Sequence, residues 1–146
     1  MDEKEVYRLL NKILQELEEV SLSWRLDGSV NLLVQGMDLK PNDLDIATNS
    51  KGLEIFYGLF KEFVVDDQLG EVASGRVLKL DIDGREVEIN SYTDKELTKL
   101  DKIQFLNWKD LSLPVLPLKE AKKFYQKINR EEKVKMIVDQ LKINKK

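Results

Sequence analysis

The sequence predicts an α+β fold, in which a small mixed β-sheet is flanked by helices and followed by C-terminal helices. Apolar residues recur at three- and four-residue spacing near both ends of the chain, whereas residues 77–92 alternate between apolar and polar side chains. Helices and strands follow one another without the regular rhythm of strand–helix–strand units. The length of 146 residues fits one domain, with a core at about 20–116 and a helical segment at 117–146.

The N-terminal half is expected to contain helices separated by short strands. Its first helix is amphipathic, and Asp2 with Glu5 forms a sequence close to a capping box. In chain order we expect a helix over 5–20, a strand over 23–26, a helix from Ser29 to Gly36, a strand over 43–47, and a helix from Asn49 or Ser50 to Phe63.

The C-terminal half is expected to begin with a β-hairpin. Asp83-Gly84 is a strong two-residue turn signal between the alternating runs 77–82 and 85–92. Residues 102–116 predict one or two short strands near a sheet edge, because Pro114 and the Pro117 that follows cannot donate ladder hydrogen bonds. Two helices follow, with a break near Asn129.

Neither histidine nor cysteine occurs in the sequence. Disulfides, Ser-His-Asp triads, Cys-His pairs and ordinary zinc sites are therefore excluded. Catalysis would have to use carboxylates, Lys, Arg, Tyr and Ser, and carboxylates without histidine typically work through Mg²⁺ or Mn²⁺. The composition favours a metal–carboxylate enzyme or a non-catalytic domain.

Neither a membrane span nor a signal peptide is expected. No apolar run approaches the roughly 20 residues that a membrane span needs. The acidic N-terminus lacks the basic-then-apolar order of a signal peptide. A cytoplasmic protein is the simplest interpretation.

The charges are distributed unevenly along the chain. Residues 117–146 carry ten Lys/Arg and four Asp/Glu, whereas residues 1–116 carry 14 and 23. The basic segment could supply cations to a phosphate ligand, or it could form an ordinary solvated helix face.

The residues best suited to chemistry lie between positions 24 and 46. Gly28 allows a ligand to approach the backbone closely, and the helix after it directs free N–H groups at that ligand. A phosphate would suit this position, and Ser29 could add its hydroxyl as a further donor. Asp43 and Asp45 are two residues apart on the next strand, so their carboxylates point to the same face. Such a pair can hold Mg²⁺ together with nucleotide phosphates. Gly28-Ser29 could also be an ordinary helix start, and Asp43 a turn residue.

A third acid is expected nearby, and two residues compete for this role. The alternation of residues 85–92 buries Val87 and Ile89 and turns Glu88 to the opposite face. If this strand pairs beside the one that carries Asp45, Glu88 joins the carboxylates. Asp81, on the preceding strand, is the alternative.

These residues resemble the motif of the DNA polymerase β-like nucleotidyltransferases. That superfamily has an apolar residue, Gly and then Gly or Ser, followed after a gap by two acids one residue apart between apolar residues. Here Leu26-Asp27-Gly28-Ser29 is followed by thirteen residues and then Asp43-Leu44-Asp45-Ile46. Asp27 replaces the usual apolar residue, and Val87-Glu88-Ile89 matches the third-acid triplet with Glu where Asp is commoner.

The resemblance covers most of residues 20–140, and it implies the nucleotidyltransferase fold. It also implies transfer of a nucleoside monophosphate from an NTP to a hydroxyl or phosphate acceptor. Within the superfamily, the chain resembles the small prokaryotic single-domain members. The implied catalytic ligands of two divalent ions, Mg²⁺ or Mn²⁺, are Asp43, Asp45 and Glu88. The implied phosphate-binding residues are Gly28, Ser29, Lys133 and Arg130, with Lys127 as a further candidate.

The acceptor corresponds to no recognisable motif. A small molecule or a protein is favoured, because the chain is short and residues 1–116 are acidic; a short RNA end stays open. The alternative to an enzyme is a catalytically inactive nucleotide- or partner-binding relative, such as an antitoxin-like module. An unrelated small α+β interaction domain is a third hypothesis. A homo-oligomer or a partner protein would be compatible with each of them.

Overall fold

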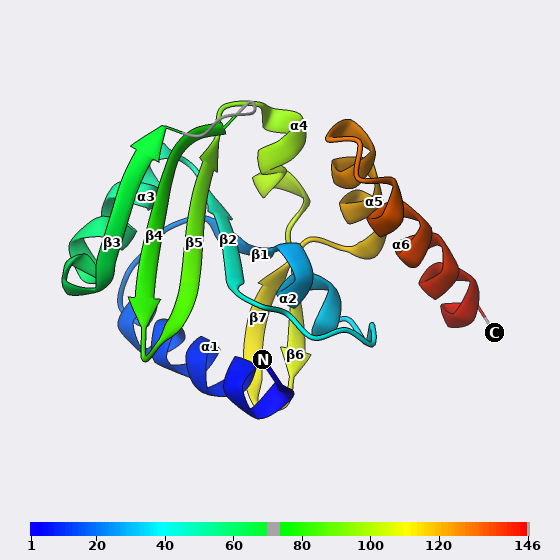
Figure 1. Cartoon of the computed structure of the whole chain (residues 1–146), viewed down its shortest axis with the longest axis horizontal. Helices are drawn as coiled ribbons and strands as arrows, with labels where there is room; N and C mark the ends of the chain where they lie inside the picture. Colours follow the sequence, from blue (N-terminus) through cyan, green and yellow to red (C-terminus); the bar gives the residue numbers. More distant parts are fainter. Residues whose placement is uncertain (70–73, 146) are drawn as a thin grey trace.

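The computed structural model of the protein describes residues 1–69 and 74–145 (Figure 1). Within those ranges the α-helices are α1 (Glu3–Leu17), α2 (Gly28–Leu33), α3 (Ser50–Leu59), α4 (Lys95–Thr98), α5 (Leu118–Lys127) and α6 (Glu131–Asn144). The strands are β1 (Trp24–Asp27), β2 (Leu44–Thr48), β3 (Val64–Leu69), β4 (Ser74–Ile82), β5 (Arg85–Tyr92), β6 (Gln104–Trp108) and β7 (Leu111–Val115). Short 3-10 turns occur at Lys61–Phe63 and Leu100–Lys102. No helix in the described part of the chain is long and apolar enough to cross a membrane.

The larger sheet is mixed, as the sequence predicts. Among the described residues its strand order is β1-β2-β5-β4-β3. The β2–β5 pair is parallel, whereas the β1–β2, β4–β5 and β3–β4 pairs are antiparallel. The parallel pair brings together two strands that are separated in the sequence by α3, β3 and β4. This long-range pairing positions the candidate site.

The β4–β5 hairpin forms where the sequence predicts it. Asp83 and Gly84 both have positive φ angles, 54° and 82°, as a tight two-residue turn requires. The backbone N–H of Gly84 donates to the Asp81 carboxylate at 2.8 Å. The turn sets the register, in which Ile82 lies opposite Arg85.

The predicted capping box at the start of α1 is also confirmed. The backbone N–H of Glu5 donates to the Asp2 carboxylate at 2.9 Å, and the Glu5 carboxylate accepts from the Asp2 backbone N–H. Such caps satisfy N–H groups that have no partner within the helix.

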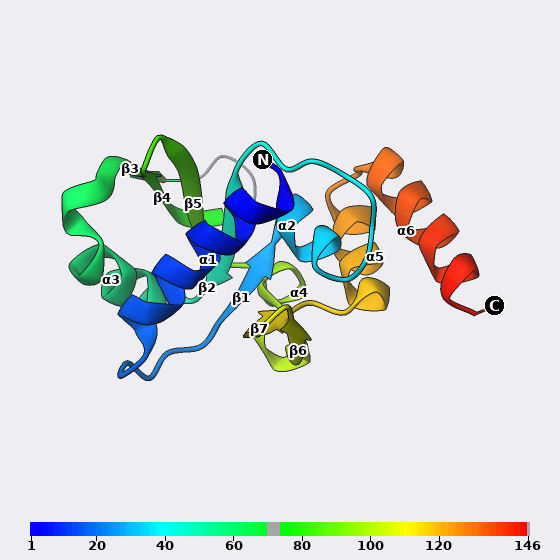
Figure 2. The same ribbon diagram turned by 90° about the horizontal axis from the view of Figure 1, so that it is seen from below.

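One face of the larger sheet, here named the closed face, carries the main core. Figure 2 shows α1 and α3 on this side of the sheet. Their apolar side chains pack against alternate residues of the strands, which removes apolar area from water. The buried strand residues are Leu26, Leu44, Ile46, Leu78, Leu80, Val87 and Ile89, and those of the two helices include Leu10, Ile13, Leu53 and Phe56. The opposite side, which faces the viewer in Figure 1, is named the open face.

The C-terminal helices form a second apolar cluster beside the sheet. It joins α5 and α6 to residues of α2 and α4 (Figure 1). Its buried members are Leu32, Met37, Leu97, Leu116, Leu118, Ala121, Phe124, Tyr125 and Ile137. Helix α2 connects the two clusters, because Val30 belongs to the main core and Leu32 to the second cluster.

The structure departs from the sequence-based elements at the end of α3, at β3 and at α4. Strand β3 was not expected, and the helix expected to reach Phe63 ends at Leu59. The short helix α4 was also missed, because four residues are too few to show a helical period. Residues 102–116 form two strands, as the sequence predicts, and β6 and β7 pair with each other in a separate two-stranded sheet.

Candidate active site

The turn between β1 and α2 lies directly against the next strand. Asp27, the last residue of β1, is opposite Asp45 in the β1–β2 ladder. Gly28 has a φ of +59°, and a Cβ atom at this position would lie 2.3 Å from Asp45 Oδ2. Both the backbone conformation and the close approach therefore require glycine. Ser29 follows in the first turn of α2.

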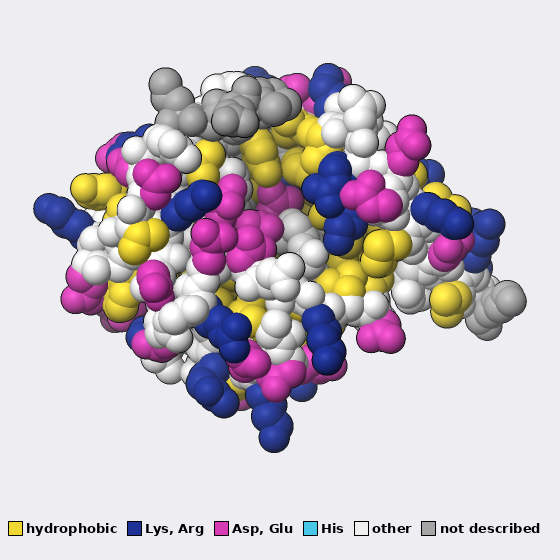
Figure 3. All heavy atoms as spheres, in the orientation of Figure 1, with side chains coloured by type: hydrophobic (Ala, Val, Ile, Leu, Met, Phe, Trp, Pro, Cys, Tyr) yellow, Lys and Arg dark blue, Asp and Glu magenta, His cyan; other side chains and the backbone are white. Residues whose placement is uncertain are grey.

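Three acidic side chains come together on the open face. Parallel pairing places Asp45 opposite Glu88, and Asp43 precedes β2 by one residue. Asp43, Asp45 and Glu88 each offer one carboxylate oxygen, and these oxygens all lie within 4.8 Å of one another. Figure 3 shows Asp and Glu side chains gathered on this face. We name these three residues the carboxylate cluster.

Asp81, the competing third acid, lies outside this cluster. It is opposite Glu86 in the β4–β5 ladder, and its carboxylate accepts the backbone N–H of Gly84. The structure therefore brings Glu88 to Asp43 and Asp45 and leaves Asp81 at the hairpin turn.

Burial and neighbouring negative charges raise the pKa values of Asp45 and Glu88. Burial, followed by the negative charges of Asp27, Asp43, Glu88 and Glu86, raises the pKa of Asp45 to about 8. Burial is also the largest cause of the raised pKa of Glu88, although the positive charge of Lys79 opposes it. Closely spaced, partly desolvated carboxylates repel one another, and a divalent cation would offset this repulsion. Oxygen donors at this spacing suit Mg²⁺ or Mn²⁺.

Sequence reasoning missed Lys79, which lies opposite Glu88 in the β4–β5 ladder. The signal was present, because the two-residue turn at Asp83-Gly84 determines which residues face each other along the hairpin. Arg25 and Tyr92, which reach Asp27 from either side, were also missed. No local pattern marks the tertiary contacts of these two residues.

The basic candidates on the C-terminal helices differ in their contacts. Lys133 Nζ donates to Ser29 Oγ at 3.2 Å, so α6 reaches the turn between β1 and α2. Arg130 donates through Nε to Glu132 at 2.5 Å. Lys127 pairs with acidic residues of the α4 region, among them Glu96 at 2.7 Å. Of these three, Lys133 is the one that contacts a predicted site residue.

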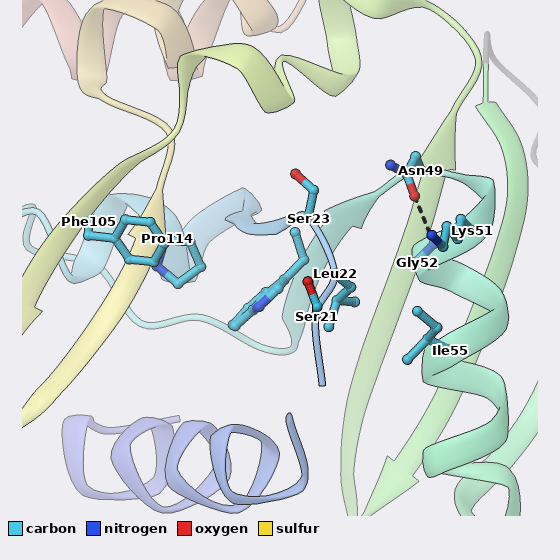
Figure 4. A pocket seen from close by; sticks show the side chains of 10 residues that line it. Ser21, Leu22, Ser23, Asn49, Lys51, Gly52, Ile55, Phe105 and Pro114 are labelled. Atoms are coloured by element: carbon cyan, nitrogen blue, oxygen red, sulfur yellow. Dashed lines mark hydrogen bonds between the residues drawn. The ribbon is translucent and has the colours of Figure 1, made fainter. Parts of the chain in front are cut away.

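A hollow of about 470 Å³ lies elsewhere, near the start of β1 (Figure 4). Ser21, Leu22 and Ser23 line it from one side, and residues of α3 and the β6–β7 hairpin line it from others. Asn49 at its edge accepts the backbone N–H of Gly52, an ordinary helix cap. The lining includes no Asp or Glu, so the chemistry of the carboxylate cluster belongs to the open face.

A mixed sheet with a Gly-Ser turn against paired acids defines a class of protein, the nucleotidyltransferases of the polymerase β-like fold, and comparison with known proteins confirms this class. The model of the aminoglycoside-2''-adenylyltransferase family matches residues 9–141, and the chain therefore belongs to that family. A search of curated proteins finds no match.

Solved structures agree with the family. A candidate nucleotidyltransferase from Thermotoga maritima is 25% identical, with a TM-score of 0.76, and the match covers 97% of this chain and 96% of that one. The antibiotic-resistance factor ANT(2'')-Ia is 14% identical, with a TM-score of 0.69 and coverage of 97% and 86%. The lincosamide antibiotic adenylyltransferase LnuA, solved with lincomycin, is also 14% identical, with a TM-score of 0.58 and coverage of 94% and 96%. By family and fold the chain is a nucleotidyltransferase.

Proposed function

We propose that the protein transfers a nucleoside monophosphate from an NTP to a hydroxyl group of a small molecule, and that this transfer depends on a divalent cation. The observation that carries the proposal is the carboxylate cluster, whose three members offer oxygens within 4.8 Å of one another beside the Gly28–Ser29 turn. In a chain without histidine or cysteine, these are the groups best suited to the chemistry.

Asp43, Asp45 and Glu88 would hold the cation, Mg²⁺ or Mn²⁺. The fit rests on the donor set, which consists of hard carboxylate oxygens, and on the burial and the mutual repulsion that together raise the pKa of Asp45 to about 8. When bound, such ions neutralise phosphate charge and stabilise the oxygens of an in-line displacement.

The phosphates of the NTP would lie at the start of α2. Gly28 leaves no side chain between the turn and Asp45, and Ser29 adds a hydroxyl. Lys133, which donates to this hydroxyl, would supply positive charge to the pyrophosphate. Arg130 lies one helical turn from Lys133 and could add a second charge once it leaves Glu132.

In the reaction the acceptor oxygen bonds to the α-phosphorus, and the bond from that phosphorus to the bridging β-phosphate oxygen breaks. Pyrophosphate is the leaving group. Glu88 would accept the proton of the acceptor hydroxyl, because it is a carboxylate that lies beside Asp43 and Asp45 at the proposed cation site. The remaining residues bind and orient the donor.

The acceptor would be a small cationic compound. The family is described by an aminoglycoside activity, and one solved relative, ANT(2'')-Ia, is in complex with adenylyl-2''-tobramycin. The acidic side chains on the open face favour an acceptor with amino groups and disfavour a polynucleotide (Figure 3). An NTP donor is available in the cytoplasm, where we place the reaction. We also propose that the chain acts as one domain, because α2 contributes to both apolar clusters.

The proposal is tested by incubating the protein with each α-³²P-labelled NTP, Mg²⁺ and candidate acceptors, including tobramycin and lincomycin. We expect label on an acceptor, pyrophosphate release, and loss of both with Asp45→Asn. Asp81→Asn is the matched control, because it removes one charge at the hairpin turn and keeps an oxygen for Gly84. Cation-dependent NTP binding without transfer to any acceptor would favour a binding relative over an enzyme.

A further inference from the structure

Asp27 is a buried carboxylate beside the carboxylate cluster, yet its oxygens are already used by the protein. Its side chain is 7% exposed. Oδ1 accepts from Arg25 Nη1 at 3.2 Å, and Oδ2 accepts from the Tyr92 hydroxyl at 2.7 Å. Both contacts fix the orientation of the carboxylate. Asp27 is therefore poorly placed to become a further ligand of a cation.

Arg25, the counter-ion of Asp27, is itself completely buried. Its remaining donors bind backbone carbonyls, among them those of Leu97 and Thr98 at the end of α4, both at 2.8 Å. The guanidinium also lies 5.6 Å from the centre of the Phe124 ring of α5. These contacts satisfy Arg25 and join β1 to the helices beside the open face.

Pairing with Arg25 does not by itself explain the position of Asp27, because a counter-ion for Arg25 would not need to lie next to Asp45. Asp27 nevertheless lies opposite Asp45 in the β1–β2 ladder, and its backbone leads into Gly28, where a Cβ atom would lie 2.3 Å from Asp45 Oδ2. This placement is unfavourable without a cation and favourable with one, because a divalent ion is attracted by a fixed negative charge that does not contact it.

We propose that Asp27, held by Arg25 and Tyr92, is a positioning residue that increases the cation affinity of the carboxylate cluster without binding the cation. This inference rests on the proposed function of the cluster. It assigns a role to Asp27, which occupies the position before the glycine where the superfamily usually has an apolar residue.

The test measures Mn²⁺ binding by electron paramagnetic resonance, with the full chain and a non-hydrolysable ATP analogue. We expect Asp27→Asn to weaken Mn²⁺ binding roughly 10- to 100-fold, as loss of a group adjacent to the ligands commonly does. Tyr92→Phe keeps the charge of Asp27, and Asp81→Asn removes a charge away from the cluster. We expect Asp81→Asn to bind Mn²⁺ within about threefold of the wild type, and Tyr92→Phe to lose clearly less affinity than Asp27→Asn, since neither changes the local charge at Asp45.

Asp27→Asn leaves Arg25 buried without a counter-ion and could fail to fold. Arg25→Met/Asp27→Leu removes both charges and replaces them with apolar side chains, a change that buried ion pairs often tolerate. We expect this double variant to fold and to bind Mn²⁺ more weakly than the wild type, but with a smaller loss than Asp27→Asn, because the opposing positive charge of Arg25 is removed as well.

The outcomes separate this inference from the proposed function. If the wild type binds Mn²⁺ and a folded Asp27 variant binds it equally tightly, the role of Asp27 is wrong and the cluster stands. If Tyr92→Phe weakens binding as much as Asp27→Asn, packing rather than charge is responsible, and the inference is again wrong. If the wild type binds no Mn²⁺, the cation site itself fails and the inference fails with it.

Discussion

The two faces of strands β2 and β5 differ in what they contribute, although they are built from the same short segments. Leu44, Ile46, Val87 and Ile89 point to the closed face and are fully buried. Asp45 and the residues of the carboxylate cluster around it point to the open face and are only partly covered. Because side chains alternate along a strand, one segment can serve the core and the site at once.

The same strand segments therefore carry the residues that stabilise the fold and the residues that perform the chemistry, but these residues lie on opposite faces and can be substituted separately. The closed face gains free energy by burying apolar area. The open face holds carboxylates that repel one another, so it costs free energy until a cation binds. Substitutions on the two faces should therefore have different signatures.

The largest effect is expected on the open face. Asp45→Asn keeps the shape of the side chain and removes a ligand charge, so we expect nucleotidyl transfer to fall roughly 10³-fold, the order seen when a transition-state charge contact is lost. Initial rates with labelled NTP measure this. A variant that kept more than a tenth of the wild-type rate would contradict the proposed role of Asp45 as a cation ligand.

On the closed face, Ile46→Ala should affect stability instead. Ile46 is fully buried, and truncation of such a residue costs about 2–5 kcal/mol through lost burial and the cavity left behind. Urea denaturation measures the loss. At a temperature where the variant stays folded, its NTP affinity should match that of the wild type, and a parallel loss of affinity would show that the faces are not separable.

The start of α2 at Gly28 is expected to tolerate no added methyl group. A Cβ at Gly28 would lie 2.3 Å from Asp45 Oδ2, so we expect Gly28→Ala to weaken NTP binding by roughly 10- to 100-fold through strain of about 1–3 kcal/mol. Gly84→Ala is the matched control, because Gly84 also has positive φ but has open space around its Cβ position. Equal losses of NTP affinity in both variants would point to backbone strain alone.

Lys133 offers a smaller effect from outside the sheet. Lys133→Ala removes the ammonium that contacts Ser29, and we expect NTP affinity to fall roughly tenfold, as for one charge-assisted hydrogen bond. Lys135→Ala on the same helix removes an equal charge from an exposed position and should leave the affinity unchanged. Calorimetric titration of ATP would compare the two.

A last effect concerns the stability of the fold without a cation. The pKa of Asp45 is raised to about 8 in the folded protein, so its ionised form opposes folding as pH rises from the unfolded pKa of about 4 toward 8. In EDTA we expect Asp45→Asn to be more stable than the wild type at pH 8, with the difference vanishing near pH 4. Thermal melts across this range would show whether Mg²⁺ reverses the order at pH 8.

The elements that could be predicted from the sequence are those with strong local signals. The β4–β5 hairpin follows from Asp83-Gly84, and the capping box marks the start of α1. Strand β3 was missed because the polar run at its centre, Asp66-Asp67-Gln68, conceals an edge strand that needs no second apolar face.

The candidate site was predictable only in part, because several of its contacts join residues that are far apart in the sequence. Asp43 and Asp45 share a face by strand geometry alone, but the approach of Glu88 depends on the parallel β2–β5 pairing, which no local pattern determines. The contact between Lys133 and Ser29 spans 104 residues and depends on how the C-terminal helices pack. Arg25, in a short strand, showed no sign of complete burial.

The central claim is that the open face binds a nucleotide through a cation held by the carboxylate cluster. Calorimetric titration of ATP into the wild type and into Asp43→Ala/Asp45→Ala, each with Mg²⁺ and with EDTA, tests it most directly. The account predicts ATP binding by the wild type with Mg²⁺, and none in EDTA or by the double variant. Equal ATP binding in EDTA, or by a folded double variant, would contradict it.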